Sequence, residues 1–318
     1  MRKIGVIYGM ENTFPSALVE RINSRNVPGI SAEHVHVGVV KMAEPSEYRV
    51  IVDRISHDIE FYRAYLKNAV LSGTIVINNP FWWSADDKFF NYALASKLGI
   101  AIPKTVVLPH KVHPTGTTEQ SMRNLAFPLD WNDIFGYIGF PAFLKPFSGG
   151  GWKNVFHVHS PQEFFEAYDQ TGTLCMTLQS AVNFDEYFRC YVVGQEAVRV
   201  MKYDPKLPHH MRYVKDGKAS SPQLHDRVVK DALTLCRALG YDFNTVEFAV
   251  QDGIPYAIDF LNPAPDADVH SVGQESFDWV VDHVADFAIK KAVSDEQPQV
   301  QYRWGHFLNG EPLKASAQ

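Results

Sequence analysis

The chain has 318 residues, which is enough for two or three structural units with cores of their own. A hydrophobic content of 46% and a charged content of 21% are ordinary for a globular protein and exclude general disorder. The net charge of −6 gives no indication of a nucleic-acid partner or an acidic membrane surface, and no apolar run is long enough to span a bilayer. Because the three cysteines form neither a metal-binding spacing nor an even-numbered disulfide framework, we expect a reducing, cytoplasmic location.

The first hundred residues alternate between predicted strands and predicted helices. Apolar runs predict strands over 3–8, 34–42, 49–55 and 74–78, and amphipathic spacing predicts helices over 14–24 and 58–71. Strands that alternate with helices favour a parallel sheet covered on both faces. We therefore predict an N-terminal, Rossmann-like α/β domain over residues 1–100.

A second pattern begins near Pro103, with strands predicted over 141–146, 154–159 and 174–179 and a helix over 161–170. Alternating residues on either side of Gly194-Gln195 predict a hairpin of strands 187–193 and 197–203. Amphipathic helices follow over 222–239, ending at Gly240, and over about 275–292. The polar residues after Ser294 are expected to form a partly ordered tail.

A predicted hairpin carries three oxygen-bearing side chains. Asp252-Gly253 separates two apolar alternating runs, which is a strong hairpin signal. Glu247, Asp259 and Asn262 lie on these strands, where unpaired acids would be costly to bury. A hard divalent cation would pair with them, and Mg²⁺ usually accompanies the phosphates of a nucleotide.

A strand lysine followed by a glycine-rich stretch forms the second group of candidate residues. Lys145 lies near the end of the strand predicted over 141–146, and Ser148-Gly-Gly-Gly151 follows that strand. Glycines let backbone N–H groups approach phosphate oxygens, while the ammonium supplies countercharge. Neither a P-loop nor a dinucleotide fingerprint is present. A flexible hairpin turn is the alternative interpretation of the glycines.

Taken together, these motifs resemble the ATP-grasp superfamily, nearest to its glutathione-synthetase-like and ribosomal-protein-glutamate-ligase-like branches. The resemblance extends from about residue 74 to 292 and rests on the order of the following segments: Asp87-Lys88, 99–105, 139–151, 178–182, 185–194, and Glu247 with Asp259 and Asn262. It implies an α/β and α+β fold in which the N-terminal domain precedes two subdomains that clamp ATP. We expect the small subdomain with its lid over 101–185, the large subdomain with the metal site over 186–293, and the tail over 294–318.

The resemblance also implies roles for individual residues. Lys88 and Lys145 would bind the phosphates of ATP, and the lid over them would consist of Ser148, Gly149, Gly150 and Gly151. The hinge that meets adenine would consist of Gln179, Ser180, Ala181 and Val182. Asp185 or Glu186 would bind the ribose. One or two Mg²⁺ ions, with Mn²⁺ as an alternative, would be bound by Glu247, Asp259 and Asn262. Lys145, Arg189 and Lys202 would be catalytic, facing the γ-phosphate or an acyl phosphate.

The metal strand departs from the family pattern. Asp259-Phe-Leu-Asn262 is one residue longer than the usual acid–any–Asn spacing. A β-bulge would bring both oxygens to one side. Otherwise Asn262 is a turn residue and the metal site is weaker.

The implied activity is an ATP- and Mg²⁺-dependent ligase that joins a carboxylate to an amine, or a thiol, through an acyl phosphate and releases ADP and phosphate. A non-catalytic ATP-binding regulatory protein and an ATP-grasp kinase acting on a small hydroxyl compound are the alternatives. The expected partners are small carboxylate and amine substrates, an amino acid or peptide among them. A homodimer is the oligomeric state that we consider. Arg49, Arg54 and Arg63 in the N-terminal domain are candidates for receiving an acidic substrate.

Overall fold

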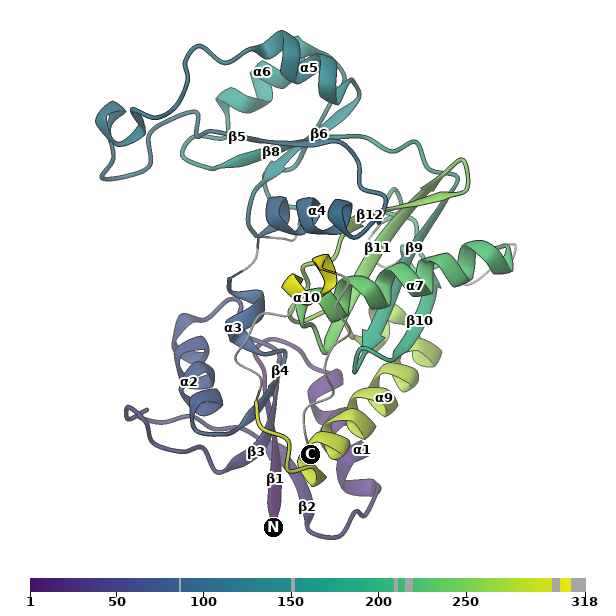
Figure 1. The fold of residues 1–318 in the computed structure, drawn as a ribbon. Helices are drawn as coiled ribbons and strands as arrows, with labels where there is room; N and C mark the ends of the chain where they lie inside the picture. Colours follow the sequence, from purple (N-terminus) through teal and green to yellow (C-terminus); the bar gives the residue numbers. More distant parts are fainter. Residues whose placement is uncertain (86, 150–151, 209–210, 215–219, 299–303, 310–318) are drawn as a thin grey trace.

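The computed structural model describes residues 1–85, 87–149, 152–208, 211–214, 220–298 and 304–309. Three four-stranded sheets follow one another along the chain. They make up an N-terminal unit, a small unit and a large unit, which are stacked along the long axis of the molecule (Figure 1). None of the described helices is long and apolar enough to cross a membrane.

The N-terminal sheet is parallel, with strand order β2-β1-β3-β4. Its elements are β1 (Arg2–Ile7), α1 (Phe14–Ser24), β2 (Ile30–His34), β3 (Tyr48–Asp53), α2 (Glu60–Leu71), β4 (Ile75–Ile77) and α3 (Pro80–Trp83). Alternate strand residues enter two separate cores: Val50 and Val52 face α1 and α9 (Gln274–Val293), whereas Ile51 faces α2. The sheet is therefore covered on both faces, as predicted.

One strand prediction in this unit is wrong. The sequence predicted a strand over 34–42, but β2 ends at His34, and residues 35–42 have no regular structure. The physical reason is the length of its neighbour. Strand β1 pairs with β2 up to Val6 and His34, and after the hydrogen bond from the Val35 N–H to the Val6 carbonyl (3.0 Å) it offers no further partner.

The small unit contains an antiparallel sheet of order β5-β8-β6-β7 with two helices on one face. Its elements are β5 (Thr105–Leu108), η1 (Glu119–Met122), α5 (Trp131–Ile138), β6 (Ala142–Pro146), β7 (Phe156–Val158), α6 (Pro161–Asp169) and β8 (Met176–Ser180). The expected strands and the expected helix are present, and Ser160 caps α6 by accepting a hydrogen bond from the Glu163 N–H.

The large unit contains the second antiparallel sheet, of order β10-β9-β11-β12. Its elements are β9 (Glu186–Val193), β10 (Ala197–Lys202), α7 (Pro222–Leu239), β11 (Phe243–Gln251), β12 (Ile254–Asp259), α8 (Val269–Val272) and α10 (Trp304–Leu308). Asp252 and Gly253 both have positive φ, of 53° and 76°, which is the conformation that a two-residue hairpin turn requires. The hairpin predicted at this dipeptide is therefore confirmed.

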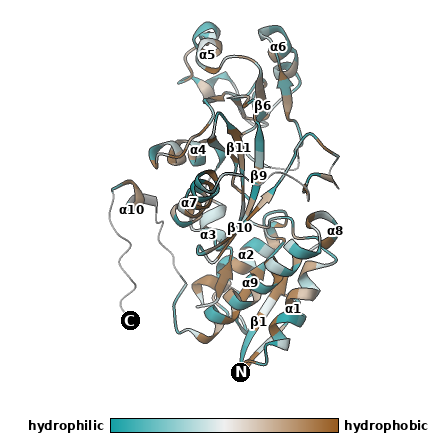
Figure 2. Ribbon diagram, turned by 90° about the vertical axis from the view of Figure 1, so that its right-hand side faces the viewer, coloured by the Kyte–Doolittle hydropathy of each residue, from teal (hydrophilic) through white to brown (hydrophobic). Residues whose placement is uncertain are grey.

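Two helices pack across the boundaries between units. Helix α4 (Lys88–Lys97) precedes the small sheet in the chain, yet Tyr92 and Leu94 lie in the core beneath the large sheet. Helix α9 follows the large sheet but packs beside α1 on the N-terminal sheet. Figure 2 shows α1 and α9 side by side, each with hydrophobic and hydrophilic residues, as expected for a helix that buries one face.

Asn78 joins the N-terminal sheet to the hairpin of the large unit. It follows β4, is 2% exposed, and its amide oxygen accepts from the backbone N–H groups of Asp242 and Phe243, each at 2.8 Å. Its amide nitrogen donates to the carbonyls of Phe243 and Pro263. Both ends of the β11–β12 hairpin are thereby fixed to the N-terminal unit.

Candidate active site

The two acids of the hairpin lie directly opposite each other. Glu247 on β11 pairs with Asp259 on β12, whereas the next pair is Phe248 with Ala257, so Ile258 is an extra, bulged residue. Because of the bulge, both Ile258 and Asp259 border the cavity that Glu247 also borders. The spacing of Asp259 and Asn262 left a bulge between them as one of two alternatives, and the bulge of this hairpin lies instead one residue before Asp259.

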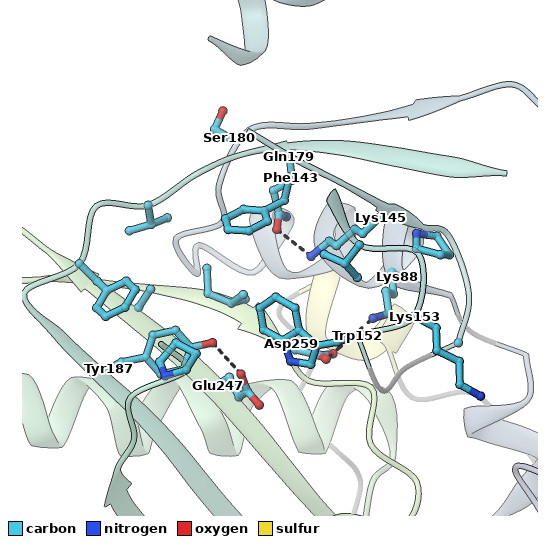
Figure 3. Close-up of a pocket in the computed structure, with 18 residues that line it drawn as sticks. Lys88, Phe143, Lys145, Trp152, Lys153, Gln179, Ser180, Tyr187, Glu247 and Asp259 are labelled. Atoms are coloured by element: carbon cyan, nitrogen blue, oxygen red, sulfur yellow. Dashed lines mark hydrogen bonds and ion pairs between the residues drawn. The ribbon is translucent and has the colours of Figure 1, made fainter. Parts of the chain in front are cut away.

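The cavity, of about 170 Å³, lies between the small and large sheets (Figure 3). Lys145 from β6 and Gln179 from β8 border it on one side, and Glu247 and Asp259 border it on the other. Lys88, the first residue of α4, also lines it. Much of the remaining wall is apolar and consists of Phe143, Pro146, Val155, Val182, Phe184, Pro205, Ala249 and Ile258.

Lys145 is a buried lysine with two fixed hydrogen-bond acceptors. Its ammonium donates to the Tyr92 hydroxyl at 2.7 Å and to Oε1 of Gln179 at 2.8 Å. Burial and the neighbouring Lys88 lower the pKa of Lys145 to about 7, against the opposite effect of Asp259 and Glu247. Among the described residues the ammonium has no third acceptor, so one N–H remains for a ligand, and an added anion would favour its charged form.

The acids are paired with cations and a tyrosine. Nζ of Lys88 lies 3.8 Å from a carboxylate oxygen of Asp259, and Nε of Arg189 lies 3.7 Å from Glu247. The Tyr187 hydroxyl donates to the other Glu247 oxygen at 2.6 Å. Burial raises the pKa of Glu247, although the charge of Arg189 lowers it. A cation beside Glu247 would stabilise its carboxylate form.

The donor atoms suit a hard cation. Two carboxylates on facing strands supply oxygens to one cavity, and Mg²⁺ commonly binds through one or two carboxylates together with the phosphates of its nucleotide. Within the described residues, no three His, Cys, Asp or Glu side chains form a complete metal cage. The residues present therefore fit Mg²⁺ that arrives with a nucleotide.

Comparisons with known proteins identify the fold. No protein-family model matches the sequence, and a search among curated proteins also finds no match. Among solved structures, the VanG D-Ala:D-Ser ligase of Enterococcus faecalis aligns with a TM-score of 0.65 and 16% identity, covering 92% of this chain and 99% of that one.

A RiPP-associated ATP-grasp ligase of Chryseobacterium gregarium, in complex with ADP and a leader and core peptide, aligns with a TM-score of 0.62, 16% identity and coverage of 94% and 100%. The ATP-grasp ligase PsnB, complexed with a minimal precursor, Mg and ADP, aligns with a TM-score of 0.59 and 13% identity, covering 92% of this chain and 98% of that one. These chains align over nearly their whole lengths. The protein has the ATP-grasp fold.

The expected adenine hinge borders the cavity of this ATP-grasp fold. Ser180 and Val182 line it, and the backbone N–H groups of Ser180 and Ala181 donate to the carbonyls of Lys104 and Pro141. Throughout the described part of the chain, the Val182 N–H finds no acceptor. It is thus available for a base. The side chain of Gln179 accepts a hydrogen bond from Lys145, and the role of its backbone in the hinge stays a prediction.

The glycine-rich segment is described only in part. Gly149 lines the cavity and has a φ of 91°, while Ser148 is exposed and does not line it. Gly150 and Gly151 lie outside the described residues. Beyond them, Trp152 borders the cavity and lies 5.8 Å from the guanidinium of Arg212, measured to the centre of its ring.

Several predicted residues lie outside the cavity lining. The amide of Asn262, beyond the end of β12, donates to the Thr245 carbonyl at 3.0 Å. Asp185 is exposed, and Glu186 pairs with Lys202 at 3.6 Å. The metal role of Asn262, the ribose role of the two acids and the catalytic role of Lys202 stay predictions.

The arginines considered for an acidic substrate have structural partners. Arg49 donates to the carbonyls of Gly73, after α2, and Ser294, after α9. Arg54 is buried and pairs with Glu11. The guanidinium of Arg63 lies 5.6 Å from the centre of a Trp83 ring.

Sequence reasoning missed two tyrosines of the site, Tyr187 and Tyr92. Tyr187 alternates with Arg189 on β9, and the same face of the strand was a usable signal. Tyr92 lies four residues after Lys88 on α4, which places both side chains on one face of the helix.

Proposed function

We propose that the protein is an ATP- and Mg²⁺-dependent ligase that joins a carboxylate to an amine. The observation that carries the proposal is a pair of lysine ammoniums facing a pair of carboxylates in one cavity between two sheets of an ATP-grasp fold. Lysines suit phosphate oxygens, and the carboxylates suit the cation that accompanies them. The bound ADP and Mg of aligned ATP-grasp ligases support the same assignment.

ATP would lie with its base against the apolar wall and the free N–H of Val182, and its phosphates between Lys88, Lys145 and the two acids. A carboxylate oxygen of the first substrate attacks the γ-phosphorus, the bond to the β–γ bridging oxygen breaks, and ADP leaves. The amine nitrogen of the second substrate then attacks the acyl carbon. Phosphate leaves, the amine loses a proton and an amide remains.

The residues of the chain contribute position and charge to these steps. Lys145, with two N–H groups fixed by Tyr92 and Gln179, directs the third at the transferring phosphate. Arg189 keeps Glu247 oriented, with Tyr187 on its other oxygen. Held by Glu247 and Asp259, Mg²⁺ would supply countercharge to the phosphate oxygens. No side-chain nucleophile is needed.

An amino acid or a peptide is the proposed substrate class. The aligned structures include a D-Ala:D-Ser ligase and a ligase bound to a leader and core peptide. A cytoplasmic location, with Cys175, Cys190 and Cys236 as free thiols, belongs to the same proposal. The homodimer stays a prediction.

ADP release from ATP and Mg²⁺, screened over pools of amino acids, dipeptides and small carboxylic acids, tests the function. A ligase forms ADP with an acid and an amine together, and with the acid alone when hydroxylamine traps the acyl phosphate as a hydroxamate. A stable phosphorylated product without hydroxamate would instead identify a kinase. ATP binding without ADP in any pool would identify a non-catalytic binder, and a thioester would move the acceptor from amine to thiol.

A further inference from the structure

A buried tyrosine connects the two sides of the proposed ATP site. Tyr92 is 4% exposed, and its ring lies edge-on to Phe260 with centres 5.8 Å apart. Its hydroxyl donates to the carbonyl of Ile258 at 3.0 Å. Because the only hydroxyl proton is directed at Ile258, the oxygen presents a lone pair to its other neighbour.

That neighbour is Lys145. Its ammonium donates to the Tyr92 oxygen at 2.7 Å and lies 5.0 Å from the centre of the tyrosine ring. Gln179 is the second acceptor, and its own amide nitrogen donates to the Thr105 hydroxyl at 2.8 Å, which fixes the orientation of the amide. Both acceptors of the ammonium are therefore held from behind, and its third N–H has a defined direction.

Ile258 is the bulged residue that places Asp259 opposite Glu247. The carbonyl that Tyr92 holds thus belongs to the bulge of the acidic strand. One hydroxyl joins that strand to β6, which carries Lys145, and it does so from α4, whose first residue is Lys88. Cationic and acidic sides of the cavity are linked through this single oxygen.

We propose that Tyr92 is a positioning residue that sets the direction of the Lys145 ammonium relative to the strand bulge that presents Asp259. The proposal rests on the ATP-dependent function above. Tyr92 is not among the residues that line the cavity, and it acts through Lys145. Loss of its hydroxyl should leave the ammonium with one fixed acceptor and misdirect its remaining N–H groups.

Tyr92→Phe keeps the ring and removes the hydroxyl. We expect kcat for ADP formation to fall about 10- to 100-fold, the loss typical of removing a group that orients a functional residue, with a smaller change in the KM for ATP. Tyr168→Phe is the matched control, because the Tyr168 hydroxyl is also on a buried side chain and donates to a backbone carbonyl, that of Pro109. Nζ of Lys111 lies 5.7 Å from the centre of the Tyr168 ring, but among the described residues no lysine donates a hydrogen bond to the Tyr168 hydroxyl. The kcat of Tyr168→Phe should equal that of the parent.

A double-mutant cycle with Lys145→Met separates positioning from general loosening of the fold. If Tyr92 acts through Lys145, Tyr92→Phe has no further effect on kcat in the Lys145→Met background. A kcat for Tyr92→Phe within about twofold of the parent would overturn the proposal, as would an equal loss in Tyr168→Phe or a full additional loss in the double variant.

The same cycle, measured as ATP affinity, distinguishes failure of this inference from failure of the proposed function. A parent that binds ATP without forming ADP refutes the ligase, yet weaker ATP binding by Tyr92→Phe only where Lys145 is present still supports the role of Tyr92. Equal weakening in both backgrounds contradicts it. A parent that binds no ATP overturns both proposals.

Discussion

Replacing Lys145 with methionine should separate activity from stability. The variant keeps an unbranched side chain of similar length and removes the ammonium that faces the proposed phosphates. Deleting one charged donor at a reacting group typically costs about 3 to 4 kcal/mol of transition-state stabilisation. We therefore expect kcat/KM for ADP formation to fall by about 10²- to 10³-fold.

The effect of the substitution on the free energy of unfolding should depend on pH. Burial lowers the pKa of Lys145 from 10.5 to about 7, so the charged form costs the folded state on the order of 5 kcal/mol. Below pH 7 both states hold the proton and the cost is fully present. Between about pH 7 and 10.5 the unfolded chain holds more protons than the folded one, and the parent therefore gains stability as pH rises.

Methionine does not titrate, so the variant lacks this gain. Relative to Lys145→Met, the parent should become more stable by about 2 to 3 kcal/mol between pH 6 and pH 9, measured by urea unfolding. Lys97→Met, which removes an exposed lysine from α4, should show neither the loss of rate nor the change with pH. An unchanged rate in Lys145→Met would refute the phosphate role of Lys145. A difference in unfolding free energy between the parent and Lys145→Met that is the same at both pH values would refute the lowered pKa of Lys145.

Three further predictions concern the metal, the domain junction and nucleotide affinity. Glu247→Gln should raise the Mg²⁺ concentration for half-maximal ADP formation by about 10- to 100-fold in a metal titration, and an unchanged curve would remove Glu247 from the metal site. Asn78→Ala leaves backbone groups that are buried or partly buried unpaired, and we expect it to lower the free energy of unfolding, measured by urea denaturation, by about 3 to 5 kcal/mol. Asn12→Ala, at an exposed position, should change the free energy of unfolding little. ATP affinity should weaken as pH rises above about 7, because bound phosphates retain a proton on Lys145 that the free protein loses. The dissociation constants of Lys145→Met, measured over the same pH range, supply the baseline for the titration of ATP itself. Parallel curves of dissociation constant against pH for the parent and Lys145→Met would contradict the phosphate role of Lys145.

Local sequence patterns predict much of the site. Asp252-Gly253 specifies the turn, and alternation on both sides of it specifies two strands with Glu247 and Asp259 on them. The strand that carries Lys145 is equally clear. Such features depend on turn chemistry and side-chain periodicity, which are properties of a few neighbouring residues.

The same patterns predict the bulge and the second strand less well. The pairing of β11 with β12 leaves Ile258 as the bulged residue. Strand β12 ends at Asp259, so Asn262 lies beyond it and donates its amide to the Thr245 carbonyl. The expected strand over 34–42 failed because β1 has no more residues to pair with it. Strand register depends on a partner as well as on the sequence of the strand.

The sequence by itself determined the order of the elements, the hairpin acids and the strand lysine, because short-range periodicity and turn residues encode them. Only the tertiary structure decided that Lys88 and Lys145 face Glu247 and Asp259, and that Tyr92 holds Lys145 against the bulge. These contacts join residues that are far apart in the chain. They exist because α4 is buried against the large sheet while its tyrosine reaches the small one, an arrangement set by the packing of whole elements.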